Sequence, residues 1–311
     1  MATYVIYSYQ FKTIDSYQLT FDHPDFKLPD PKKSFERKQG LLEEILSHPE
    51  FSFNKDKNDD TYVHQIVRQQ DHMWLIHIGK KHMKKRHNRK LRQEQFEDFP
   101  NCFFMIDNRH NIQRIAIEKK RDAFGKTLQL AKLLQDIFND KLKYHGLTVE
   151  ILAKYYSRSF WKHIEEFAPG FTKVTFTFNI PNNPELTELV EKFIPMEAEV
   201  FNATPVHTMI AKDGGVVTIA HNDFTDPIVN YCSGGGLPIE LTPKGSKRKV
   251  KCFVNEKTEE KYAVEEEFDE RITAALVNET VAPSTHDLNW QEVVMFLNHL
   301  KLFYTDDQEN K

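Results

Sequence analysis

Long apolar runs are missing from this chain. No stretch of its 311 residues approaches the roughly 18 to 20 uncharged apolar residues that cross a bilayer as a helix. The first residues, MATYVIYSYQFKT, also lack the basic flank and the small-residue cleavage site of a secretory signal peptide. We therefore expect a soluble, cytoplasmic protein that does not itself insert into a membrane.

Cysteine is also scarce. Cys102, Cys232 and Cys252 are far apart in the sequence, and none belongs to a CxxC pair. An odd number of cysteines without metal-binding spacing fits reduced thiols in a core better than disulfides or a zinc site. We expect neither a disulfide nor a zinc ion to hold this fold together.

Complete phosphate-binding loops are absent. Gly125, Lys126 and Thr127 look like the end of a Walker motif, but Lys120 stands where that motif needs its first glycine. The triplet Gly234–Gly236 lacks the spacing of a dinucleotide fingerprint, and a flexible connection before a strand explains it better. Neither an NTPase nor a dinucleotide-binding protein is favoured, and no cofactor is predicted.

The histidines do not indicate a metal site. His72, His77, His82 and His87 recur every five residues, a step that points successive side chains about 140° apart on a helix and to alternate faces of a strand. They cannot converge on one ion without loops, so solvated or phosphate-contacting histidines are favoured. No GxSxG or other nucleophile setting is present, so we favour a protein that is not an enzyme.

The chain does have charge that is gathered by sign. The segment Gly79–Arg92 contains eight cations and no acid, and a second basic cluster lies between Lys244 and Lys251. Without these thirteen cations, 29 basic residues remain against 46 acidic ones, a net charge of −17 for the rest of the chain. A basic footprint on an acidic body is therefore expected. The thirteen cations are Lys80, Lys81, Lys84, Lys85, Arg86, Arg89, Lys90, Arg92, Lys244, Lys247, Arg248, Lys249 and Lys251.

The succession of strand and helix signals is typical of an α+β protein with mixed or antiparallel sheets and flanking helices. The clearest signal is a long helix over Phe124–Leu142, which has apolar residues at steps of three and four and Gly146 just past its end. Other predicted helices are Pro31–Leu46, capped by Asp30, Ser157–Phe167, a helix opened by Asn183 and broken at Pro195, and a final helix capped near Asp287. Predicted strands are Thr3–Phe11, Thr61–Arg68, Met73–Ile78, Asn101–Asp107, Ile112–Ile117, Leu147–Ala153, Phe171–Phe178, Val206–Ala211, Val216–Ala220, Leu237–Leu241 and Val250–Val254.

Two domains are expected, because 311 residues exceed what one core usually holds. The pattern begins again after Gly146, so we predict an N-terminal domain over residues 1–146 and a C-terminal domain, with the final helix, over residues 147–311. Each domain is expected to carry one basic cluster on a hairpin end. The first follows the hairpin that turns at Gln69–Asp71, and the second lies at the tip between Leu241 and Val250.

One enzymatic alternative uses Asp107, Glu118 and Lys120. An acid at the end of one strand and an E-x-K at the end of the paired strand resemble the triad of restriction-type nucleases, where two carboxylates hold Mg²⁺ and the lysine helps with the attacking water or the phosphate. Glu43 or Glu44 on the preceding helix could complete it. Because 28% of the residues are charged, this loose pattern arises by chance in most sequences of this length, and a solvated hairpin end is the favoured interpretation.

The basic clusters favour nucleic acid as the partner. The competing interpretation is a solubilising loop. However, an acid-free run cannot form local ion pairs, and Arg interleaved with Asn and His offers phosphate hydrogen bonds as well as charge. No helix-turn-helix, zinc-finger or RNA-recognition signature is present, so the expected binding is independent of base sequence. Three classes remain open: a nucleic-acid-binding module, a Mg²⁺-dependent nuclease and a protein-interaction scaffold.

The order of segments resembles that of RexA, the DNA-binding component of the lambda phage exclusion system, and of related bacterial proteins linked to phage defence. The likeness is carried by the aromatic first strand and by NCFFMIDNRHNIQRIAI, FGKTLQLAKLLQDIF, SRSFWKHIEEF and TKVTFTF. It is a likeness of layout over roughly Tyr4–Lys251, and no motif aligns residue by residue. The resemblance implies a two-domain, dimeric, sequence-nonspecific binder of duplex DNA that acts in phage defence beside a membrane-protein partner.

Overall fold

The computed structural model describes residues 1–14, 30–54, 59–110, 112–178, 206–235, 237–246, 248–253, 263–278 and 287–300. The chain forms two compact units. The first joins Met1–Ile151 with Glu266–His299, and the second consists mainly of Leu152–Glu265. Antiparallel strand pairs flanked by helices confirm the predicted α+β class.

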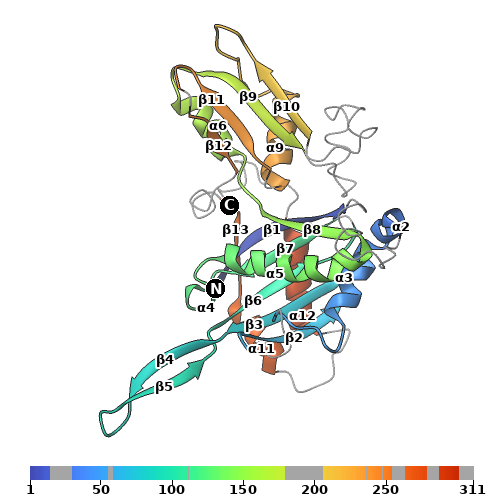
Figure 1. Ribbon diagram of the computed structural model, residues 1–311, viewed down its shortest axis with the longest axis vertical. Helices are drawn as coiled ribbons and strands as arrows, with labels where there is room; N and C mark the ends of the chain where they lie inside the picture. Colours follow the sequence, from blue (N-terminus) through green and yellow to red (C-terminus); the bar gives the residue numbers. More distant parts are fainter. Residues whose placement is uncertain are drawn as a thin grey trace, which may run out of the picture. The chain divides into compact units, whose positions relative to one another are not determined.

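A seven-stranded sheet forms the centre of the first unit (Figure 1). The strand order is β13-β1-β7-β6-β3-β2, and β8 also pairs with β1. The pairs β1–β7, β7–β6, β6–β3 and β3–β2 are antiparallel. The strands are β1 (Ala2–Thr13), β2 (Tyr62–Gln70), β3 (Met73–Lys80), β6 (Asn101–Asp107), β7 (Arg114–Glu118), β8 (Leu147–Ala153) and β13 (Glu265–Phe268).

Strand β1 is covered on both faces, which explains its nearly continuous aromatic and aliphatic sequence. The Tyr7 hydroxyl donates a hydrogen bond of 2.9 Å to Thr127 Oγ1 at the start of α5 (Thr127–Leu142). The ring of Tyr4, on the opposite face of the strand, packs 5.6 Å from that of Phe296 in α12 (Leu288–His299). The helices α5 and α12 therefore pack against opposite faces of this sheet.

The helices that precede β2 and follow β7 begin or end near the residues that the sequence predicts as caps, Asp30 and Gly146. The Asp30 side chain accepts a hydrogen bond of 3.0 Å from the Lys32 N–H, as expected for an N-cap. The single predicted helix after it is two, α2 (Pro31–Glu36) and α3 (Lys38–Leu46), with a break at Arg37. The long helix predicted over Phe124–Leu142 begins at Thr127, and a separate short helix, α4 (Arg121–Phe124), precedes it and ends at Gly125, which has a φ of 59°.

The C-terminal helices belong to the first unit. Helix α12 packs beside α11 (Glu270–Asn278), and its N-terminus is capped by Asp287, whose carboxylate accepts from the Asn289 N–H at 2.9 Å. Asp287 also pairs with the buried Arg68 of β2. The final helix thus groups with residues 1–151 and not, as predicted, with residues 147–311, because its apolar face covers the first sheet. The sequence did not predict β13 or α11.

The second unit contains a four-stranded sheet in the order β10-β9-β11-β12. The sequence predicts strands over both Val206–Ala211 and Val216–Ala220, but β10 pairs with β9, from Val206 opposite Phe178 to Ala211 opposite Lys173. Residues 216–220 form no strand. The elements of this unit are α6 (Arg158–Glu166), β9 (Phe171–Phe178), β10 (Val206–Ala211), α9 (Thr225–Gly235), β11 (Ile239–Pro243) and β12 (Val250–Cys252).

Two further expectations concern these elements. Gly234 and Gly235 lie in the last turn of α9, so the glycine triplet is in part helical and is not only a connection. The helix predicted from Asn183 lies outside the described residues.

All three cysteines are free and buried, and burial raises the pKa of the Cys252 thiol to about 12. No helix among the described residues is long and apolar enough to cross a membrane.

Candidate nucleic-acid interface

The first basic segment forms a two-stranded ribbon of its own. Beyond β3 the chain continues into β4 (His82–His87), turns, and returns as β5 (Gln93–Asp98). The two strands pair only with each other, from His82 opposite Asp98 to His87 opposite Gln93. At about 3.4 Å per residue, six residues extend roughly 20 Å. Figure 1 shows the ribbon reaching away from the seven-stranded sheet.

Asn88 holds the turn at the end of the ribbon. Its side-chain oxygen accepts hydrogen bonds from the backbone N–H groups of Lys90 (2.9 Å) and Arg92 (3.1 Å). Its side-chain nitrogen donates to Glu94 Oε1 at 2.7 Å, and its backbone N–H donates to the Arg92 carbonyl at 2.9 Å. Leu91 completes the turn with a φ of 58°. One asparagine therefore fixes the positions of three consecutive exposed residues.

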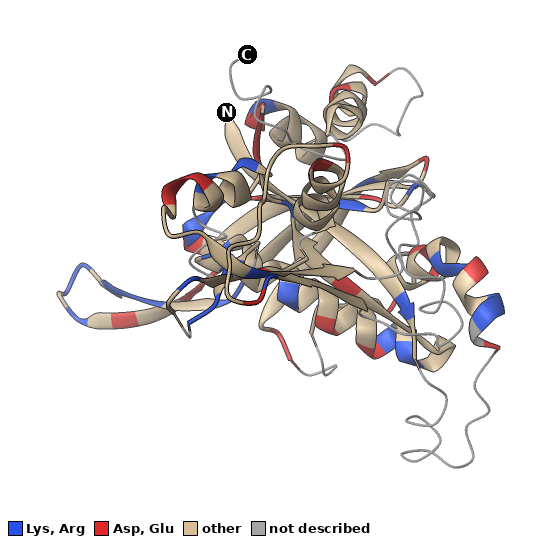
Figure 2. Cartoon of the chain, turned by 90° about the horizontal axis from the view of Figure 1, so that it is seen from above, with Lys and Arg blue, Asp and Glu red and all other residues tan. Residues whose placement is uncertain are grey.

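The two faces of the ribbon differ in charge, because successive side chains of a strand point to opposite faces. On one face, Lys84 and Arg86 share the surface with the acidic side chains of Glu94 and Asp98 on β5. On the other face, Lys85 lies opposite Gln95 and His87 opposite Gln93, and the one acid of β5 on this face is Glu97 near the base. Figure 2 shows the basic positions along one strand and the turn, with an acidic segment on the returning strand.

Acidic partners hold two of the predicted cations. Lys84 Nζ lies 2.5 Å from Asp98 Oδ2, and this hydrogen bond raises the pKa of Lys84 and lowers that of Asp98. Lys81 Nζ lies 2.6 Å from both Asp60 Oδ2 and Glu97 Oε1. These acids lie outside the acid-free run, at Asp60 and on β5, so neighbours from elsewhere in the chain supply the ion pairs that the run cannot form within itself.

The cations in the outer part of the ribbon form no ion pair with a described acid, although Glu94 lies opposite Arg86. Within the described residues, no ion pair includes Lys85, Arg86, Arg89, Lys90 or Arg92, and all five side chains are exposed. The Arg86 guanidinium lies 5.0 Å from the centre of the Phe96 ring, a cation–π contact that leaves its charge uncompensated. We call these five residues the outer cations. They combine five positive charges with four exposed neighbours, His87, Leu91, Gln93 and Gln95.

The second basic cluster is partly neutralised. Lys249 Nζ and Lys251 Nζ lie 2.6 Å and 2.9 Å from the carboxylate of Glu240 on the neighbouring strand β11. Their hydrogen bonds lower the pKa of Glu240 to about 2. Lys244 and Arg248 are exposed, and Lys247 lies outside the described residues. As predicted, this cluster lies on the end of a hairpin, between β11 and β12. It belongs to the second unit, whereas the ribbon belongs to the first.

The alternative nuclease residues do not come together. Asp107 pairs with Arg114 across the β6–β7 hairpin, whereas Glu118 accepts a hydrogen bond from the Phe103 N–H at 2.8 Å. Four residues along β6 separate these positions, about 13 Å at roughly 3.3 Å per residue. Asp107 is buried and forms a two-pronged ion pair with Arg109, at 2.8 Å and 2.5 Å.

Lys120 and Glu43, which also belong to the alternative nuclease set, lie at different ends of the hairpin. Lys120 Nζ lies 3.7 Å from Glu118, at the Glu118 end of the hairpin. Glu43 accepts hydrogen bonds from the Asn108 side chain at 2.9 Å and is 2.6 Å from His72 Nδ1. The carboxylates needed to share one Mg²⁺ are therefore divided between two ends of the sheet.

The regularly spaced histidines are dispersed, as the five-residue step indicates. His77 stacks on the Phe103 ring at 4.2 Å and is 2.8 Å from the Asn101 side-chain oxygen, while His87 is on the ribbon. In the described part of the chain, no group of three or more His, Cys, Asp or Glu side chains is arranged to hold a metal ion. The Walker-like Thr127 is in a helix, where its hydroxyl accepts from Tyr7.

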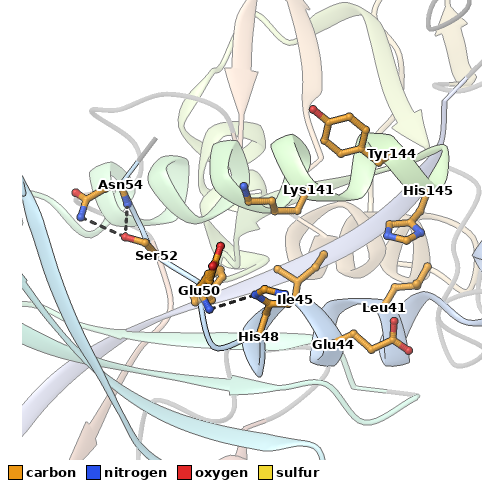
Figure 3. Close-up of a pocket in the computed structure, with 11 residues that line it drawn as sticks. Leu41, Glu44, Ile45, His48, Glu50, Ser52, Asn54, Lys141, Tyr144 and His145 are labelled. Atoms are coloured by element: carbon orange, nitrogen blue, oxygen red, sulfur yellow. Dashed lines mark hydrogen bonds between the residues drawn. The ribbon is translucent and has the colours of Figure 1, made fainter. Parts of the chain in front are cut away.

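A cavity of about 480 Å³ lies beside α3 and α5 (Figure 3). Its polar lining includes Glu44, Glu50, Lys141 and His145, and the His48 ring nitrogen accepts from the Glu50 N–H at 3.2 Å. Because the wall carries both acidic and basic groups, the cavity favours neither an anionic nor a cationic ligand. The cavity therefore does not compete with the ribbon as the main candidate for a binding site.

In comparisons with known proteins, the chain matches no family model, no curated protein and no solved structure.

Proposed function

We propose that this protein binds duplex DNA without sequence preference through the outer part of the β4–β5 ribbon. The observation that carries the proposal is the contrast between the base and the outer part of the ribbon. Acids compensate Lys81 and Lys84 near its base, whereas the five outer cations face solvent and form no ion pair with a described acid. A solubilising loop does not require such sorting of charge along its length.

Phosphate contact is the chemistry that this surface supports. Arg and Lys side chains neutralise phosphates and release condensed counterions, which supplies affinity that does not depend on base sequence. Gln93, Gln95 and His87 add hydrogen-bonding groups between the cations. The ribbon is narrow enough to follow a groove, since the β-ribbons of DNA-binding proteins lie in the major or the minor groove.

The biological setting of the proposal rests on the resemblance to RexA. We propose a cytoplasmic sensor or adaptor in phage defence that forms a homodimer and acts beside a membrane-protein partner. The second basic cluster has an assisting role in this proposal through Lys244 and Arg248, because Glu240 compensates its two neighbours on β12.

A matched pair of lysines tests the proposal. Lys84 and Lys85 are adjacent and exposed, but only Lys84 has a carboxylate partner. We expect wild-type binding to random-sequence duplexes to weaken with salt at a slope of about −4 to −5 in log K against log salt, from about five phosphates. Lys85→Gln should flatten the slope by about 0.9. Lys84→Gln should leave it unchanged, because its charge is already compensated.

Replacing Lys85, Arg89, Lys90 and Arg92 together by Ala should reduce the slope to about −1, equally for all DNA sequences. Fluorescence anisotropy titrations at several salt concentrations measure these slopes, and far-UV circular dichroism monitors folding. The proposal fails if the wild-type protein does not bind duplex DNA at 50 mM salt, or if Lys84→Gln and Lys85→Gln change the slope alike.

A further inference from the structure

Leu91 is an apolar side chain at the extreme end of a charged element. It is 83% exposed, the highest value among the exposed large hydrophobic residues of the described chain. Lys90 and Arg92 flank it, and Arg89 is in the same turn. Burial of apolar surface stabilises a fold, and the exposed Leu91 side chain therefore contributes almost nothing to the stability of this one.

The backbone at Leu91 is equally unusual. Its φ of 58° is in the left-handed region, which Gly, Asn and Asp adopt far more readily than leucine. A three-residue hairpin loop commonly needs one residue in that conformation, and glycine would satisfy the turn alone. Strained backbone that the surrounding structure maintains is a reason to look for function. Here the hydrogen bonds of Asn88 to Lys90 and Arg92 hold the leucine outward.

A partner that binds the end of the ribbon must accept the apolar Leu91 side chain directly beside phosphates or other anions. In duplex DNA, stacked base pairs lie only a few ångströms inside two rows of phosphates. Apolar side chains such as leucine insert between base steps from the minor groove while nearby cations hold the backbone. The outer cations continue from the end of the ribbon to Arg86 and Lys85, one on each face of β4, which fits a groove with phosphates on both sides.

An anionic membrane is the other surface that combines apolar and anionic groups. One leucine buries little area there, since stable membrane attachment needs a larger apolar face or two independent anchors. The distribution of the cations along the ribbon, in place of a ring around its end, also favours a groove over a plane. The observations therefore favour DNA.

We propose that Leu91 inserts as a wedge between adjacent base pairs and kinks the bound DNA. This inference rests on the proposed function, and it makes the preferred ligand a bent or locally unstacked duplex. Leu91 would act through the base stack, whereas the outer cations act on the phosphates. The two contributions are therefore separable by measurement.

Two substitutions distinguish the wedge from the turn. Leu91→Asn suits the left-handed conformation and removes the apolar group, while Leu91→Met keeps the apolar group. A short duplex labelled at both ends reports bending by energy transfer. We expect wild-type protein and Leu91→Met to bend it by roughly 20–90° and to bind a nicked duplex several-fold more tightly than an intact one. Leu91→Asn should lose both the bend and the preference, with its salt slope unchanged.

The outcomes separate the wedge from DNA binding as such. Binding with the expected salt slope but without a bend, or an equal bend with Leu91→Asn, overturns the wedge and leaves the proposed function intact. A wild-type protein that does not bind DNA overturns both. Cosedimentation with phosphatidylserine vesicles that Leu91→Asn abolishes, in the absence of DNA bending, would assign this end to a membrane surface and also overturn the wedge.

Discussion

Lys84 and Lys85 are neighbours of the same type, but they leave β4 on opposite faces of the ribbon. Lys84 meets Asp98 at 2.5 Å, and Lys85 lies opposite the neutral Gln95. The availability of a cation for a phosphate therefore depends on the residue across the ribbon and not on the residues next to it in sequence. Glu240 shows the same principle in the second unit, where one carboxylate compensates two lysines.

The surroundings of Asp107 lead to a prediction about nuclease activity. Since Arg109 occupies both of its oxygens and Glu118 lies four residues farther along the hairpin, we expect no nicking of supercoiled plasmid with Mg²⁺ or Mn²⁺. Gel electrophoresis of plasmid after incubation with the protein measures this. Nicking by the wild type that Asp107→Ala abolishes would instead establish the nuclease.

At the level of elements, the ribbon differs from the strand pairs of the central sheet. The burial of the central sheet specifies its register, whereas both faces of β4 and β5 are largely exposed. Cross-strand contacts hold it together, among them the Lys84–Asp98 ion pair and the Arg86–Phe96 contact. A solvent-exposed two-stranded hairpin contributes little to the stability of a domain.

The ribbon can be removed by design with little expected effect on folding. His82 and Asp98 are directly opposite each other, so Asn-Gly in place of Met83–Glu97 would join them in a two-residue hairpin turn. We expect the melting temperature to change by no more than about 2–4 °C, the equivalent of roughly 1 kcal/mol. Binding to duplex DNA should fall to the level of the quadruple alanine variant.

Calorimetry and anisotropy titrations of the shortened protein give the two readings. A loss of more than about 10 °C would mean that the ribbon supports the fold, a role that its separate pairing does not indicate. Undiminished DNA binding would place the interface elsewhere, and the exposed Lys244 and Arg248 would then be the next candidates.

On the scale of the whole molecule, the first unit is built from two segments that are distant in sequence. Met1–Ile151 supplies six strands of the large sheet, and Glu266–His299 supplies α11 and α12. Tyr4 is fully buried, and its ring packs 6.1 Å from Phe268 and 5.6 Å from Phe296. The chain therefore leaves this unit, forms the second unit and returns.

This return predicts the behaviour of fragments. Residues 1–151 alone would expose Tyr4 and would lack Asp287 and Trp290, which hold the buried Arg68 by an ion pair and a cation–π contact. We expect this fragment to lack the near-UV circular dichroism signal of a packed core. Joining it to residues 266–299 through a Gly/Ser linker should restore a cooperative urea transition, and Phe296→Ala should weaken that transition.

A fragment of residues 1–146 that folds cooperatively by itself would contradict the discontinuous unit. It would instead support the division at Gly146 that the sequence pattern predicts. The comparison therefore separates the two descriptions of domain organisation.

Local signals determined much of this protein. The buried aromatic strand β1, the Asp30 and Asp287 caps and the hairpins β2–β3, β6–β7 and β11–β12 follow from side-chain periodicity and turn chemistry, which act over a few residues. The position of the second basic cluster on a hairpin end followed from the same signals, whereas the first cluster forms a hairpin of its own that they did not predict. For these features, the information lies within the segment itself.

Only the tertiary structure decided which distant segments meet. Nothing in the polar segment Gln93–Asp98 shows that it would pair with β4 and select which lysines stay uncompensated, because exposed strands lack an apolar pattern. The strand Val206–Ala211 pairs with β9 and not with residues 216–220, which follow it in the sequence. The helix α12 packs against Tyr4, near the other end of the chain. The last two choices depend on burial shared between segments about 30 to 290 residues apart, and a local pattern does not encode them.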